Sequence, residues 1–133
     1  MTPKAREHRF RRLKEMGCIA SFIDGMPGVP PEIHHLNLGG KAGQKRRGDE
    51  ATIPLSRWHH RGIPAQGMTA AQMTELYGPS LAHNSRAFRA RYGSDDELLA
   101  KVNDLIRMMD ELATAHLSEA LDVASLEKQC TTR

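Results

Sequence analysis

The stretch EIHHLNLGGKAGQKRRGDEATIPLSRWHHRG, residues 32–62, decides the fold. It holds two His-His pairs, each beside a short segment rich in β-forming residues. Residues 32–36 and 51–55 are predicted strands, and Pro54 indicates that the second strand lies at an edge or ends abruptly. Residues 56–62 are predicted to form a turn of helix that ends at a glycine. We therefore expect a β-hairpin followed directly by a short helix.

Helices are predicted on both sides of this stretch. They cover residues 3–16, 70–76 with Thr69 as N-cap, and 86–92 with Ser85 as N-cap. A last helix opens at the capping box Ser94-Asp-Asp-Glu97 and is the strongest in the chain. The apolar residues that keep helical spacing through it are Leu98, Leu99, Val102, Leu105, Ile106, Met109 and Leu112. A weaker continuation of this helix is expected to run to about Leu126.

These elements predict an α+β fold, a small ββα hairpin module embedded in helices with a long C-terminal helix. We expect a first domain over residues 1–93. Residues 94–133 would be a helical extension that packs on it or on a second copy, which would make a homodimer.

Composition favours a metal and a polyanionic partner. Apolar residues are 39% of the chain and aromatics only 5%, so the core should be thin, and thin cores often depend on metals. Seven histidines make a metal the first candidate, whereas two cysteines are no disulfide framework. Residues 1–62 carry 12 Lys and Arg against 6 Asp and Glu, while residues 63–133 carry 7 against 10. A basic half that also holds both histidine pairs suits a nucleic acid, the alternative being a solvated charged face.

Targeting segments are not evident. The basic N-terminus lacks the apolar core of a signal peptide, and no apolar run approaches the roughly 20 residues that span a bilayer. We expect a cytoplasmic protein with no membrane association.

The paired histidines predict a metal site. Neighbouring side chains in a strand point to opposite faces, so His34 and His35 cannot share one role. One would bind a metal while the other faces water, and His60 would approach the same metal from the following helix. Neutral imidazole is a good ligand for transition metals, and a histidine that titrates near neutral pH can take a proton from water. In the alternative interpretation, the histidines only cap strands or hydrogen-bond to neighbours.

The sequence also resembles the HNH nuclease superfamily, and within it the Ref-like, RecA-dependent nucleases of phages and bacteria. The resemblance covers about residues 17–106. It rests on five stretches taken together: Cys18-Ile-Ala-Ser21, Glu32-Ile-His-His35, Gly48-Asp-Glu-Ala-Thr-Ile-Pro-Leu55, Arg57-Trp-His-His-Arg-Gly62 and His83-Asn-Ser-Arg-Ala-Phe-Arg-Ala-Arg-Tyr-Gly93. It implies a metal-dependent DNA endonuclease and a recombinase filament as a partner.

The resemblance assigns catalytic roles to individual residues. His34 and His60 would bind the divalent metal, Mg²⁺, Mn²⁺ or Zn²⁺, and His35 would be the general base. The middle position of the motif, usually Asn, falls near Asp49 or Glu50, and we favour Glu50.

The resemblance further implies a structural zinc knuckle. Cys18 and His59 match two of its ligand positions, whereas Ser21 and Ser56 stand where the family often has cysteines. Because a neutral serine replaces thiolate poorly, a normal four-ligand zinc site should not form. Either the knuckle is lost, or His83 or another group completes it.

Basic residues next to the motif are candidates for contacts with the DNA backbone; they are Lys41, Lys45, Arg46, Arg47 and Arg61. Trp58 is expected in the core rather than as a stacking platform. Two other functions stay open. One is a non-catalytic DNA- or protein-binding module of the same ancestry, which Ser21, Ser56 and the missing Asn favour. The other is a metal hydrolase acting on a small phosphoester.

Overall fold

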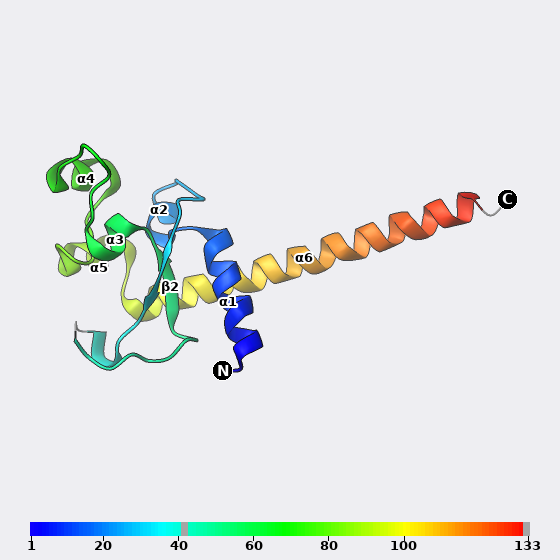
Figure 1. Ribbon diagram of the computed structural model, residues 1–133, viewed down its shortest axis with the longest axis horizontal. Helices are drawn as coiled ribbons and strands as arrows, with labels where there is room; N and C mark the ends of the chain where they lie inside the picture. The colour runs from blue at the N-terminus through cyan, green and yellow to red at the C-terminus, as the bar shows by residue number, and fades with distance from the viewer. Residues whose placement is uncertain (41–42, 132–133) are drawn as a thin grey trace.

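A computed structural model of the chain describes residues 1–40 and 43–131. It confirms the α+β class, with helices packed around one small sheet (Figure 1). The elements in chain order are α1 Pro3–Met16, α2 Ile19–Ile23, β1 Glu32–His35, the 3-10 turn η1 Leu38–Gly40, β2 Thr52–Leu55, α3 Arg57–Arg61, α4 Ala70–Tyr77, α5 Ser85–Tyr92 and α6 Asp95–Thr131.

The predicted hairpin is present. β1 and β2 pair antiparallel, with His34 opposite Ile53 and His35 opposite Thr52. In a sheet of two strands both are edges, which explains why Pro54, without an amide hydrogen, is tolerated in β2. Such a hairpin is marginally stable by itself, so it depends on the helices packed against it.

The core lies between β2 and the helices around it. All four residues of β2 are buried, and α1, α2 and the first part of α6 pack against this strand. The largest buried side chains come from every layer; among them are Leu13, Ile19, Ile53, Leu55, Phe88, Leu98 and Val102. Trp58 is only 3% exposed, as expected for a core residue.

A half-buried arginine joins three of these elements. Arg9 of α1 donates from Nε to Oγ1 of Thr52 over 2.9 Å and from a terminal nitrogen to the Thr52 carbonyl over 2.7 Å. Its other terminal nitrogen donates to the Asn103 side chain on α6 over 2.8 Å. Because guanidinium donates in a rigid fork, one side chain sets the position of α1 relative to both β2 and α6.

The first half of α6 belongs to the packed body and the second half does not. The helix opens at the predicted capping box, since the Ser94 and Glu97 backbone amides each donate to the other residue's side chain. Residues 111–128 are all exposed, and Figure 1 shows this half projecting away from the other elements. The helix continues to Thr131, five residues past Leu126, near which its weaker continuation was expected to end.

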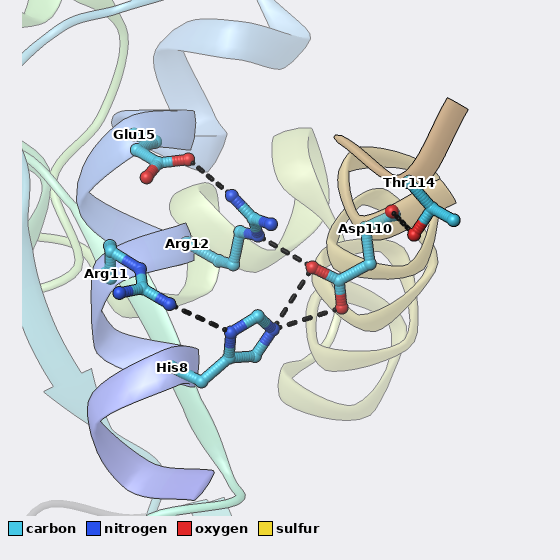
Figure 2. Close-up of polar contacts among 6 residues, drawn as sticks. All are labelled: His8, Arg11, Arg12, Glu15, Asp110 and Thr114. Carbon is cyan, nitrogen blue, oxygen red and sulfur yellow. Dashed lines mark hydrogen bonds and ion pairs between the residues drawn. The ribbon is translucent and has the colours of Figure 1, made fainter. Parts of the chain in front are cut away.

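Figure 2 shows the polar contacts that hold α6 to α1 just before this projection. Asp110 accepts from Arg12 Nε over 2.7 Å and lies 3.1 Å from His8 Nε2. Partial burial acts to raise the pKa of Asp110, but hydrogen bonds from Arg12 and His8 hold it below its usual value. The carboxylate therefore stays ionised and joins the two helices.

Two local features differ from the sequence expectations. The five-residue helix α2 has too few residues for a periodic pattern, and the sequence did not predict it. The N-cap of α5 is Asn84, whose side chain accepts from the Ala87 amide, rather than Ser85. Both are good capping residues, so their identities alone do not decide the register.

Among the described helices, none is both long enough and apolar enough to cross a bilayer. The predicted boundary between residues 93 and 94 stays a prediction.

Candidate functional site

The hairpin and the helix after it bring His34 and His60 together. Their ring centroids are 4.7 Å apart and the rings are tilted by 59°. His34 extends from β1, and His60 from α3, which follows β2 after the single residue Ser56. Ser56 caps α3 by accepting from the His59 amide, so the helix begins at once and its first turn lies beside β1.

Both rings favour the neutral state. Burial, followed by the nearby charges of His60, His35, Arg89 and Arg46, lowers the pKa of His34 to about 4. Burial also lowers the pKa of His60, although its hydrogen bond to Glu32 acts in the opposite direction. Because a neutral imidazole keeps one nitrogen lone pair, the two rings can serve as metal ligands at neutral pH.

Glu32 is a site residue that sequence reasoning missed. Its Oε1 atom lies 3.2 Å from His60 Nδ1 and accepts from Arg61 Nε over 2.8 Å, and Arg61 also pairs with Oε2. The Arg61 hydrogen bonds, against a smaller effect of burial, hold the pKa of Glu32 below its usual value. Glu32 and His34 are two residues apart in one strand and therefore share a face. This spacing could have identified Glu32 as a site residue from the sequence.

His35 lies on the opposite face of β1 with a carboxylate partner. Its Nε2 atom is 3.0 Å from Oδ1 of Asp49, and its ring meets the edge of Phe10 with centroids 6.3 Å apart. A carboxylate only accepts, so Nε2 carries the proton and Nδ1 keeps a lone pair that can take another. The side chain is 22% exposed, so solvent reaches it.

The structure places Asp49, not the favoured Glu50, against His35. Glu50 is exposed and folds back over Gly48, where a Cβ atom would lie 2.8 Å from its carboxylate oxygen. The turn of the loop before β2 decides between the two neighbours, and sequence spacing does not specify that turn.

The four positions of the implied zinc knuckle form a buried hydrogen-bonded cluster. His59 Nδ1 lies 2.9 Å from Ser56 Oγ and 3.4 Å from Cys18 Sγ, and the Ser21 amide also reaches this sulfur. His59 Nε2 is 2.8 Å from the carbonyl of Tyr77, which can only accept. Nε2 therefore carries the proton, and Nδ1 accepts from the serine hydroxyl.

This cluster does not fit a structural zinc ion. Two of its four side chains are neutral hydroxyls, and the imidazole of His59 already has partners on both nitrogens. Among the side chains that the structure describes, in residues 1–39 and 43–128, no three from His, Cys, Asp or Glu gather as a metal would require. His34 and His60 bring two imidazoles together, whereas a typical catalytic zinc site uses three protein ligands.

His83, the candidate for completing the knuckle, has a different environment. Its Nε2 atom donates to the carbonyl of Gly62 over 2.8 Å, and its ring packs on Trp58 with centroids 5.5 Å apart. Gly62 ends α3 at φ +68°, and a Cβ atom there would lie 2.3 Å from the His83 ring. His83 thus covers the end of α3 and forms no three-ligand group with Cys18 and His59.

Several predicted DNA contacts already have acidic partners. Arg47 pairs with Asp96 over 2.7 Å, and Arg61 pairs with Glu32. Lys45 and Arg46 are exposed, while Lys41 lies outside the described residues. Arg46 and Arg89 both contribute to lowering the pKa of His34, so positive charge lies near this histidine. The sequence analysis did not select Arg89.

An apolar pocket of about 360 Å³ opens beside the buried cluster and not beside the histidine pair. Its walls come from α3, α4 and the loop before β1, and include Val29, Trp58, His59, Ile63, Met73 and Tyr77. His59, the imidazole in its wall, is already hydrogen-bonded, so this pocket offers no acid or base for hydrolysis.

Replacing both serines of the cluster by cysteine should create a zinc site. The S21C/S56C variant would bring three thiols and one imidazole together, which is a common set for structural zinc. We expect it to bind one more zinc ion per chain than wild type, measured by elemental analysis and by thiolate-to-cobalt absorption. S118C/S125C on the exposed part of α6 is the matched control. Equal zinc content in wild type and S21C/S56C would contradict this description of the cluster.

Comparison with known protein families gives one match. The model of the family described as "Recombination enhancement, RecA-dependent nuclease" matches residues 3–107. No curated protein matches the chain. The matched segment contains the hairpin, α3 and the first part of α6, and every histidine described above lies within it. The chain therefore belongs to the recombination enhancement, RecA-dependent nuclease family.

Proposed function

We propose that this nuclease is a metal-dependent DNA endonuclease of the HNH type, with its catalytic centre at His34, His35 and His60. The observation that carries the proposal is the pair of desolvated imidazoles, 4.7 Å apart, on β1 and α3. Both rings are half-buried, and burial lowers the pKa of each. Perturbed titratable groups gathered at one site are typical of catalysis.

His34 and His60 would hold the divalent ion. Such an ion, when bound, stabilises negative charge on a phosphodiester and on the oxygen that leaves. His35 would accept the proton of the attacking water at Nδ1, while Asp49 holds the ring through Nε2 and stabilises the imidazolium that forms. This use of a carboxylate to orient a histidine base follows the logic of the serine protease triad.

The basic side chains around the site support a long polyanion over a small phosphoester. Lys45 and Arg46, which are exposed, would contact the DNA backbone directly, whereas Lys41 lies outside the described residues. Arg47 and Arg61 would exchange their carboxylate partners for phosphate, or hold those carboxylates in place. The family description also supports a recombinase filament on the DNA as the condition for cleavage.

His35→Ala should abolish nicking of DNA and leave metal binding intact. The variant lacks the proposed base, and the loss of a general base typically slows a reaction by about 10²–10⁴-fold. Plasmid nicking is measured with and without a RecA filament, and bound metal by elemental analysis. His116→Ala on α6 is the matched control and should nick at the wild-type rate. Unchanged nicking by His35→Ala would reject this residue as the base, while metal binding without nicking by wild type would favour a non-catalytic binding module.

We also propose that the projecting half of α6 pairs with a second copy of the chain. Five of its Leu and Val side chains are 54–63% exposed; they are Leu112, Leu117, Leu121, Val123 and Leu126. The face that packs on the body through Leu98 and Met109 continues through Leu112 and Val123 at helical spacing. Most helical stability in proteins comes from packing of an apolar face, so a partner along the projecting half would stabilise it.

Light scattering after size exclusion tests this pairing. Wild type should be a dimer, and L112E/V123E should be a monomer with an unchanged core, because the substitutions put charge into the apolar face. Ser118→Glu on the polar face is the control and should remain a dimer. A monomeric wild type at high concentration would contradict the proposal.

A further inference from the structure

We propose that Glu32 is a positioning residue that fixes the tautomer of His60, so that His60 Nε2 presents a lone pair on the side of His34. The inference rests on the proposed metal site and extends it to a residue that touches neither metal nor substrate. The juxtaposition that carries it is Oε1 of Glu32, 3.2 Å from Nδ1 of His60.

The direction of this hydrogen bond follows from the chemistry of its partners. A carboxylate paired with guanidinium is ionised and can only accept, so His60 must donate from Nδ1. A neutral imidazole carries one ring proton, which leaves Nε2 with its lone pair. In water the neutral side chain carries its proton mainly on Nε2, so without Glu32 the nitrogen needed for coordination would be blocked more often. The tautomer of a metal-binding histidine is commonly set by the partner of its other nitrogen.

Arg61 keeps Glu32 in this supporting role. It contacts both carboxylate oxygens, Oε1 over 2.8 Å and Oε2 by a second hydrogen bond. Oε1 also accepts a hydrogen bond from His60 Nδ1. Because both carboxylate oxygens are already hydrogen-bonded, Glu32 is not itself placed as a metal ligand. Arg61 and His60 are neighbours on α3, and together they hold one strand residue in a fixed orientation.

The first experiment reads the His60 tautomer in the metal-free protein. Long-range ¹H–¹⁵N correlation spectra at pH 8, above the ordinary imidazole pKa, distinguish a proton on Nδ1 from one on Nε2. We expect Nδ1–H in wild type. Glu32→Gln should keep it, because the amide oxygen still accepts, whereas Glu32→Ala should shift the proton toward Nε2. Glu75→Ala, which removes an exposed carboxylate on α4, is the control and should match wild type.

The second experiment measures Mn²⁺ affinity of the same proteins by calorimetry. Glu32→Ala should bind roughly 10–100-fold more weakly, as is typical when the partner of a metal-binding histidine is removed, and Glu32→Gln should recover most of the affinity. A His60 proton that stays on Nδ1 in Glu32→Ala, or an unchanged Mn²⁺ affinity in that variant, would overturn the positioning role. A wild-type protein with the expected tautomer and no Mn²⁺ binding would instead contradict the proposed metal site.

Discussion

The site depends on one buried ring, His59. Its Nδ1 atom is hydrogen-bonded to Ser56 and lies against the sulfur of Cys18, and its Nε2 atom is hydrogen-bonded to the carbonyl of Tyr77. These contacts fix the rotation of α3 about its axis. Because successive helical residues differ by about 100°, holding His59 in the core turns His60 toward β1. The two members of the second histidine pair thus have different tasks, one structural and one at the surface of the site.

Neutral histidines surrounded by arginines are a consistent arrangement for binding a cation and a polyanion together. Burial and the neighbouring positive charges keep His34 unprotonated, with a pKa of about 4. Two other arginines, Arg47 and Arg61, pair with the carboxylates of Asp96 and Glu32. A phosphate that replaces these carboxylates would meet guanidinium groups already oriented by them, so less side-chain entropy would be lost on binding.

The sequence sufficed for what local patterns control. Strand alternation placed His34 and His35 on opposite faces, and the short link from β2 to α3 brought His60 to His34. The capping box correctly located the start of α6. Features that depend on tertiary contacts were missed. The path of the loop before β2 places Asp49, rather than Glu50, against His35. His83 packs on Trp58, which is distant in sequence. Helix α2 is too short to give a periodic pattern. Strand alternation places Glu32 on the same face as His34, but Glu32 was not predicted to be a site residue.

A shared cation at His34 and His60 is tested by an anomalous difference map from crystals grown with Mn²⁺. We expect one strong peak between these two rings, absent from crystals of a His34→Ala/His60→Ala protein. A map with no peak there, or with its strongest peak at Cys18 and His59, would contradict it.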